Sequence, residues 1–293
     1  MGAKRGPTLR AQWLGKYLKE FRESAKLTLR QAGDYLQRDA ASISRLESGI
    51  IPARVSDVFA LLNLYGIGDE KIRDGLERLS RDIWRRGWWD DGYAADSLGV
   101  MFDHAWLENR AEGIRCYAAM LVPGLLQIRD YAQEVITAGG VDVPSEQIER
   151  WVEFRMDRQR VLDAELAPSI EIVLDEAVLH RMIGGPKVMC AQLEHLSEAA
   201  TRSNVIIRVL PFAAGAHASP EGAFMIFDMP VPYSDVICVE TRGGAVYTEA
   251  AEGVENFAQA YDSLRSAALT PDESATVIRS AVSRTKRAKG RSR

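Results

Sequence analysis

The residue types that most often carry catalysis or bind metal ions are sparse and widely spaced in this chain. Its four histidines and three cysteines follow none of the spacings at which proteins usually hold a metal ion, and no CxxC pair occurs. The sequence also contains no phosphate-binding glycine loop and no nucleophile elbow. Asp175 and Glu176 are adjacent carboxylates after a strand-like segment, and we interpret them as the start of a helix. We therefore expect no enzyme, no metal site and no cofactor.

A different chemistry, hydrogen bonding to base edges and phosphates, is offered by residues 27–49. This segment predicts two short helices, LRQAGDYL and AASISRLES, joined by a tight turn. Thr28 and Asp39 occupy the N-cap positions of the two helices, and Gly49 would end the second. Gly33 falls where the helices approach most closely, so a small residue is needed there. The small core between the helices would consist of Leu27, Leu36, Ile43 and Leu46.

The segment resembles the helix-turn-helix module of the phage-repressor family, which is also called the Cro/CI or xenobiotic-response-element (XRE) family. The residues that carry the resemblance are Leu27, Thr28, Leu36, Ile43, Ser44, Arg45, Leu46, Glu47 and Gly49. In that family Glu47 ties the third helix to the rest of the domain. Two positions depart from the family pattern: Leu29 stands where Gln is common, and Gln37 stands where the turn usually has Gly, because the backbone there takes a positive φ.

The resemblance implies that the second helix lies in the major groove of an operator. The residues that would face the bases are Ala40, Ala41, Ser44 and Arg45. Arg45 is the expected reader of guanine, and the alanines can contact a thymine methyl group. The candidates for contacts to the DNA backbone are Thr28, Arg30, Arg38, Ser42 and Arg54, of which Ser42 could also reach a base. The alternative for each arginine is an ordinary solvated side chain.

The net charge of −4 hides three regions of different sign. Residues 1–54 hold 11 lysines and arginines against 5 aspartates and glutamates, whereas residues 88–278 hold 13 against 30. Residues 279–293 hold 7 basic residues and no acidic one. A basic end can neutralise phosphates even in an acidic protein. The basic tail is expected either to be a disordered arm that adds DNA affinity or to be a solvated helix end.

Hydrophobic periodicity and turn residues divide the chain into four parts. They are a helix-turn-helix domain at 1–80, an aromatic-rich junction at 81–99, an α+β sensor or partner-binding domain at 100–278 and the basic tail at 279–293. Short strand-like segments near 222–249 predict an antiparallel meander. The expected fold is therefore an N-terminal all-α domain followed by a mixed α+β domain with a small, largely antiparallel sheet.

Residues 100–278 resemble the C-terminal domain of the actinobacterial WhiJ-like regulators. The stretches that carry this resemblance are 121–127 with Tyr131 and Ala132, 173–176, 184–186, 192–196, 209–212 with 215–217, and 264–269. The resemblance implies a transcriptional regulator with a presumed ligand-binding or partner-binding domain. It also implies an antitoxin-like arrangement, in which a small partner protein is encoded nearby.

These observations lead to one preferred function and one alternative. The preferred function is a cytoplasmic, sequence-specific DNA-binding regulator that binds as a homodimer and senses a small molecule or a partner protein. The alternative is an antitoxin-like protein whose main task is to hold a small partner, with DNA binding used for autoregulation. The candidate ligand pocket consists of Tyr117, Gln127, Tyr131 and His217. No segment is apolar over the 18 or so residues that a membrane-spanning helix needs, so no membrane partner is expected.

Overall fold

A computed structural model of the protein describes residues 8–84, 99–140, 143–231, 233–242 and 244–291. The chain divides into two compact units, which are described separately. Unit 1 comprises residues 1–105 and 231–233, and unit 2 comprises residues 106–230 and 234–293. Most of the predicted junction, residues 85–98 of the 81–99 span, lies outside the described residues.

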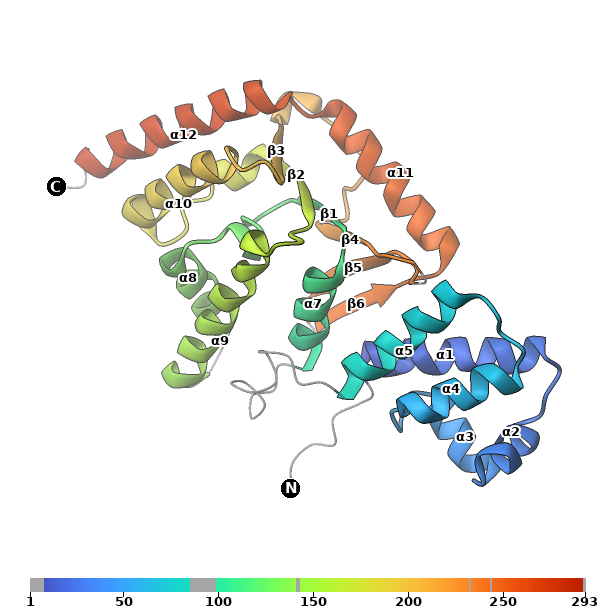
Figure 1. Ribbon diagram of the computed structural model, residues 1–293. Coiled ribbons are helices and arrows are strands. Elements are labelled where there is room, and N and C mark those ends of the chain that lie inside the picture. The colour runs from blue at the N-terminus through green and yellow to red at the C-terminus, as the bar shows by residue number, and fades with distance from the viewer. Residues whose placement is uncertain (1–7, 85–98, 141–142, 232, 243, 292–293) are drawn as a thin grey trace. The chain divides into compact units, whose positions relative to one another are not determined.

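Within the described residues 8–84, unit 1 has five helices that pack around a small apolar core (Figure 1). They are α1 (Leu9–Ser24), α2 (Leu29–Leu36), α3 (Ala40–Glu47), α4 (Val55–Leu64) and α5 (Glu70–Trp84). The largest buried side chains of the core come from α1, α3, α4 and α5, and include Trp13, Leu14, Leu18, Ile43, Leu61, Leu62, Leu76 and Leu79. Both short helices begin at the N-caps predicted from the sequence, Thr28 and Asp39.

Unit 2 contains a six-stranded sheet in the order β3-β2-β1-β4-β5-β6. The strands are β1 (Gly113–Ala118), β2 (Ser169–Asp175), β3 (Val205–Leu210), β4 (Phe224–Asp228), β5 (Val236–Thr241) and β6 (Gly244–Thr248). The first three strands pair in parallel, and β1, β4, β5 and β6 pair antiparallel.

The prediction of a small, largely antiparallel sheet is therefore wrong: the sheet is mixed. The predicted meander is present as β4–β6. The parallel half forms because helices lie in the connections from β1 to β2 and from β2 to β3, and such crossovers are what parallel pairing requires. The sequence contained those helices, but it did not show which strands they bring together.

Helices cover both faces of this sheet (Figure 1). The helices of unit 2 are the end of α7 (Gly99–Arg110), α8 (Arg129–Gly139), α9 (Ser145–Arg158), α10 (Gly185–Ala199), α11 (Ala251–Ala267) and α12 (Pro271–Arg291). On one face α11 packs on a cluster that includes Tyr117, Val173, Phe224 and Tyr261. The residues of the opposite face point toward α7, α8 and α9.

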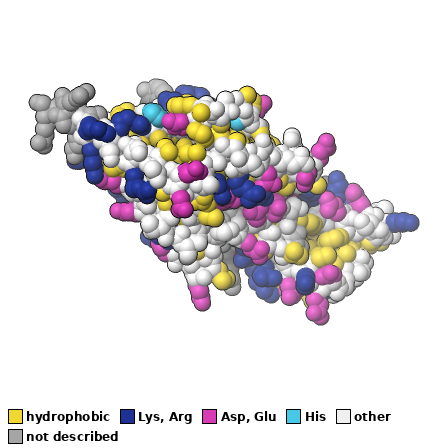
Figure 2. Space-filling view, turned by 90° about the horizontal axis from the view of Figure 1, so that it is seen from above, with side chains coloured by type: hydrophobic (Ala, Val, Ile, Leu, Met, Phe, Trp, Pro, Cys, Tyr) yellow, Lys and Arg dark blue, Asp and Glu magenta, His cyan; other side chains and the backbone are white. Residues whose placement is uncertain are grey.

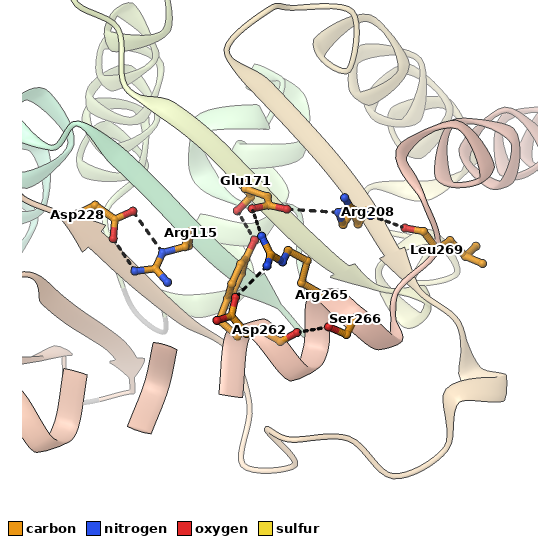
Figure 3. A network of polar contacts seen from close by, with 9 residues as sticks. Arg115, Glu171, Arg208, Asp228, Asp262, Arg265, Ser266 and Leu269 are labelled. Carbon is orange, nitrogen blue, oxygen red and sulfur yellow. Dashed lines mark hydrogen bonds and ion pairs between the residues drawn. The ribbon is translucent and has the colours of Figure 1, made fainter. Parts of the chain in front are cut away.

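The face under α11 carries an ordered network of ion pairs (Figure 3). Arg115 donates to both carboxylate oxygens of Asp228, at 3.2 and 2.5 Å. Glu171 accepts from Arg208 at 3.3 Å and lies 3.9 Å from Arg265, which also pairs with Asp262. Every arginine of this network therefore has a carboxylate partner.

Two local predictions need adjustment. The helical pattern of residues 125–139 in the sequence predicts one helix, but in the structure a 3-10 turn (Gly124–Leu126) precedes α8. The break occurs because Gln127 is extended and its side-chain amide donates to the carbonyl of Val122, at 2.7 Å. The basic tail continues α12 as far as Arg291, so the described part of it is a helix end. Its exposed basic side chains include Arg279, Arg284, Lys286 and Arg287.

Candidate nucleic-acid interface

The turn between α2 and α3 is held by backbone features that set the angle between the two helices. Gln37 ends α2 in the left-handed conformation, with φ 56° and ψ 42°. A Cβ atom on Gly33 would lie only 2.6 Å from the carbonyl oxygen of Arg38, so no larger residue fits there without a shift. The chain therefore approaches itself closely at Gly33, as the sequence predicted, and places Gln37 where glycine is usual.

α3 is fixed to the rest of unit 1 by its buried face and by one ion pair. Ile43 and Leu46 are fully buried, whereas Leu27 and Leu36, which were predicted to share their core, are half-buried. Arg22 of α1 donates to both carboxylate oxygens of Glu47, at 2.6 and 2.8 Å. This hydrogen bonding raises the pKa of Arg22 despite its burial. The role that the family resemblance implied for Glu47 is thus confirmed.

The opposite face of α3 is open to solvent. Ala41, Ser44 and Arg45 are exposed, and Ala40 and Ser42 are half-buried beside them. The N-cap Asp39 accepts from the backbone N–H of Ser42 at 2.6 Å. The Arg45 guanidinium donates to the Ser42 hydroxyl at 2.9 Å and lies 4.0 Å from the Asp39 carboxylate. The predicted base-facing residues therefore share one exposed surface, with Arg45 held at its edge by two short side chains.

The predicted backbone-contacting residues have different surroundings. Arg30 and Arg54 are exposed. Thr28 forms a capping box with Gln31, in which its hydroxyl accepts from the Gln31 N–H at 3.2 Å. Arg38 instead pairs with the largely buried Asp57 of α4 at 3.0 Å. This ion pair links the turn to α4, so Arg38 has a structural contact that the sequence did not show.

The four residues of the predicted ligand pocket do not converge on one site. In unit 2 a cavity of about 290 Å³ is lined by Tyr117 and Gln127, but not by Tyr131 or His217. Tyr131 is fully buried, and its hydroxyl accepts from the N–H of Val122 at 3.2 Å. It therefore shapes the segment that precedes the 3-10 turn.

His217 meets Tyr117 at the ends of the parallel strands. The Tyr117 hydroxyl lies 3.3 Å from Nε2 of His217 and 3.4 Å from a carboxylate oxygen of Asp175. Burial, together with the Asp175 carboxylate, raises the pKa of Tyr117, so its hydroxyl stays protonated and can donate to either neighbour.

The sequence did not predict the charged side chains that line this cavity. Arg158 of α9 and Glu108 of α7 form a fully buried ion pair with two hydrogen bonds, at 2.6 and 2.8 Å. Arg155, one turn earlier in α9, lines the same cavity. The sequence did contain a sign of this, because Arg155 follows Ile148 and Val152 at the helical spacing of an apolar stripe. A charged residue at a position where the helix otherwise has apolar residues indicates a polar site in the interior.

Among the described residues, no group of three or more His, Cys, Asp or Glu side chains could hold a metal ion. In the face shown by Figure 2, Lys and Arg side chains are interspersed with Asp and Glu side chains, and hydrophobic side chains lie between them. No helix in the described part of the chain has the length and apolar character needed to cross a membrane.

Comparison with known families assigns both halves of the chain. Residues 13–74 match the model of a helix-turn-helix domain, which supports DNA binding by unit 1. Residues 102–280 match the model described as a domain of unknown function (DUF5753). No curated protein and no solved structure matches the chain. Because the second match spans more than half of the sequence, the chain belongs to the DUF5753 family, and it carries an N-terminal helix-turn-helix domain.

Proposed function

We propose that this protein is a sequence-specific transcriptional regulator that reads an operator through α3. The observation that carries the proposal is the surface of α3, where Ala41, Ser44 and Arg45 are exposed together while Ile43 and Leu46 anchor the helix. The N-terminal residues of such a helix enter the major groove. Arg45 donates two hydrogen bonds to guanine, and the alanine methyl groups contact thymine.

The contacts that hold the protein on the duplex come from the surrounding elements. Arg30 and Arg54 approach phosphates, as do the N-terminal ends of α2 and α3, whose N–H groups favour negative charge. These contacts set position and affinity, and they do not read sequence. Binding as a homodimer to a pseudo-palindrome doubles the surface that reads DNA, and it matches the two-fold symmetry of such sites.

The acidic half of the chain acts as the regulatory part. Residues 88–278 hold 30 acidic residues against 13 basic ones, and this excess repels phosphate. The acidic domain at 88–278 is therefore not the part that binds DNA. The second domain binds a small ligand or a partner protein, and a coupling free energy of about 1–3 kcal/mol is enough to switch operator occupancy. The proposal assigns no catalysis to the chain and places it in the cytoplasm as a WhiJ-like regulator of an actinobacterium.

One observation favours the antitoxin-like alternative, namely the same acidic excess. A small basic partner would be attracted by this surface, and it would form the complex that autoregulates through the helix-turn-helix domain. Co-expression of the chain with the proteins encoded beside its gene separates the two functions. A stable complex with one small neighbour supports the alternative, and its absence supports the ligand-responsive regulator.

The test of DNA reading is selection of bound sequences from random duplex DNA. The proposal predicts a pseudo-palindromic motif whose half-sites are separated by about one helical turn, or by a multiple of one turn. Light scattering of the complex should then give two chains per duplex. Recovery of unrelated sequences without a shared motif would contradict the proposal.

A further inference from the structure

The cavity of unit 2 has an apolar floor and a charged rim. It lies between the sheet and the segment that includes the 3-10 turn, and its volume is about 290 Å³. The floor is formed by apolar side chains of the sheet, namely Ile114, Cys116, Ala118, Ile170, Ile172, Met225 and Cys238. The polar part of the lining is formed by Glu108, Gln127, Arg155, Arg158 and Glu240. Concave sites with an apolar lining and a few converging polar groups are typical of small-molecule binding.

Two of the four charges in this cavity are already neutralised. Arg158 and Glu108 are both almost inaccessible to solvent and face each other with two hydrogen bonds. An ion pair of this geometry needs no further partner. It forms a fixed wall of the cavity and leaves Arg155 and Glu240 as the charges that remain.

Among the described residues no carboxylate pairs with Arg155, unlike its neighbour Arg158 in the same helix, which pairs with Glu108. Its Nη1 donates to the neutral side chain of Gln127 at 2.8 Å, and its buried Nε has no acceptor. Burial and the positive charge of Arg158 lower the pKa of Arg155 to about 10, so it remains charged at neutral pH. By contrast, Arg115, Arg208 and Arg265 each have a carboxylate partner within 4 Å (Figure 3).

Arg155 as a whole is half-buried, but a buried N–H donor such as its Nε requires an acceptor, and an anionic acceptor forms the stronger hydrogen bond. The carboxylates of Glu108 and Glu240 line the same cavity, and Arg155 is the one cation of its described lining that pairs with no carboxylate, so a second negative charge on the ligand would meet repulsion. The apolar floor requires a hydrocarbon body. These three conditions describe a small organic acid with a single charge.

We propose that this cavity binds a small monocarboxylic acid with an apolar body, whose carboxylate accepts hydrogen bonds from Arg155. The assignment deepens the proposed function, and it rests on that function only in treating the second domain as ligand-responsive. Gln127 positions the guanidinium, because its side chain joins Arg155 to the carbonyl of Val122. The hydrocarbon chain of the ligand lies along β1 and β2.

The test is isothermal titration of the full-length protein, without DNA, using four probes: octanoate, octanamide, octanedioate and butanoate. Octanoate is expected to bind with one site per chain. Octanamide is expected to bind at least about tenfold more weakly, because it lacks the charge that pairs with Arg155. Octanedioate carries a second charge and butanoate a shorter apolar body, so both should also bind more weakly. This comparison uses the unmutated chain and does not depend on the folding of any variant.

Variants then assign the contact. Arg155→Met should weaken octanoate binding at least about tenfold, and Arg155→Lys should retain part of the affinity. The matched control is Arg150→Met, which removes an exposed arginine of the same helix and should change nothing. Circular dichroism and the thermal midpoint establish that each variant is folded.

Three results would overturn the proposal. They are no saturable octanoate binding up to about 10 mM, equal affinity for octanoate and octanamide, or undiminished binding by a folded Arg155→Met variant. None of them affects DNA binding, which is measured separately on the same preparations. Failure of this proposal is therefore distinguishable from failure of the proposed function.

Discussion

Arg45 is the residue on which sequence reading depends. It is exposed on α3, and its guanidinium contacts the Ser42 hydroxyl at 2.9 Å and Asp39 at 4.0 Å. Both contacts lie at the surface and can be exchanged for contacts to a base. Arg45→Ala should reduce binding to the selected operator by about 1–3 kcal/mol while leaving binding to random DNA nearly unchanged.

The control for this prediction is Arg78→Ala, which removes an exposed arginine of α5 in the same unit. Fluorescence anisotropy with both duplexes measures the two effects. An Arg45→Ala variant that still prefers the operator as strongly as the unmutated chain would exclude α3 as the reading helix.

Gln37 carries backbone strain at the helix-turn-helix turn. It is one of two described non-glycine residues with a positive φ, and the left-handed conformation costs a non-glycine residue about 1–2 kcal/mol. Because glycine loses more entropy on folding, Gln37→Gly should raise the free energy of unfolding by a net amount of about 0.5–1 kcal/mol. Ala41→Gly in the exposed part of α3 should lower it by about 1 kcal/mol. Urea denaturation, monitored by circular dichroism, measures the free energy of unfolding of both variants. A change of the same sign in Gln37→Gly and Ala41→Gly would contradict this account.

At the scale of elements, the start of α3 depends on the charge of its N-cap. Hydrogen bonds from the hydroxyl and the backbone N–H of Ser42 lower the pKa of Asp39 below its ordinary value. A carboxyl whose pKa is lower in the folded state stabilises the fold above its unfolded pKa, and this contribution is lost as the pH falls through the folded pKa. Asp39→Asn retains a cap without the titrating charge.

The thermal midpoint of Asp39→Asn should therefore fall less than that of the unmutated chain between pH 6 and pH 3. Asp34→Asn, which changes an exposed carboxylate within α2, serves as the control and should follow the unmutated chain. If the thermal midpoints of Asp39→Asn and of the unmutated chain fall by the same amount over this pH range, the charge of the cap does not stabilise α3.

An ion pair with two hydrogen bonds links α1 to α3. The side chains of Arg22 and Glu47 are 9% and 6% exposed, and they share two short hydrogen bonds. Glu47→Ala leaves the Arg22 charge buried without its partner, and should destabilise unit 1 by about 3–5 kcal/mol. Glu77→Ala breaks the more exposed Glu77–Arg81 pair of α5, and should cost less than about 1 kcal/mol. Denaturant unfolding measures the loss in the free energy of unfolding of each variant. Losses of similar size for Glu47→Ala and Glu77→Ala would contradict this prediction.

At the scale of the whole molecule, local signals in the sequence predicted individual elements but not their assembly. Caps and periodicity gave α2 as residues 29–36, which the structure confirms, because Thr28 and the following apolar pattern act over a few residues. The parallel pairing of β1, β2 and β3 depends on how long crossovers return to the sheet, and no local pattern encodes that.

Of the two candidate sites, only the one formed by a local motif could be predicted. The helix-turn-helix motif predicted the exposed residues of α3, and the structure places Ala41, Ser44 and Arg45 together at the surface. The cavity could not be predicted in this way, because its lining comes from α7, α9 and four strands far apart in the sequence. Tyr131 and His217 were predicted to line a ligand pocket. In the structure they do not line this cavity: Tyr131 contacts the N–H of Val122, and His217 contacts the hydroxyl of Tyr117.

The most direct test of the central claim is a titration of the full-length protein against DNA from upstream of its own gene and a scrambled duplex, at two salt concentrations. We expect tight binding to the upstream DNA, weaker binding to the scrambled DNA, and an affinity that falls steeply with salt as phosphate contacts release counterions. Equal, weak binding to both duplexes would contradict the assignment of α3 as a sequence-reading helix, since the basic segments alone would then account for DNA affinity.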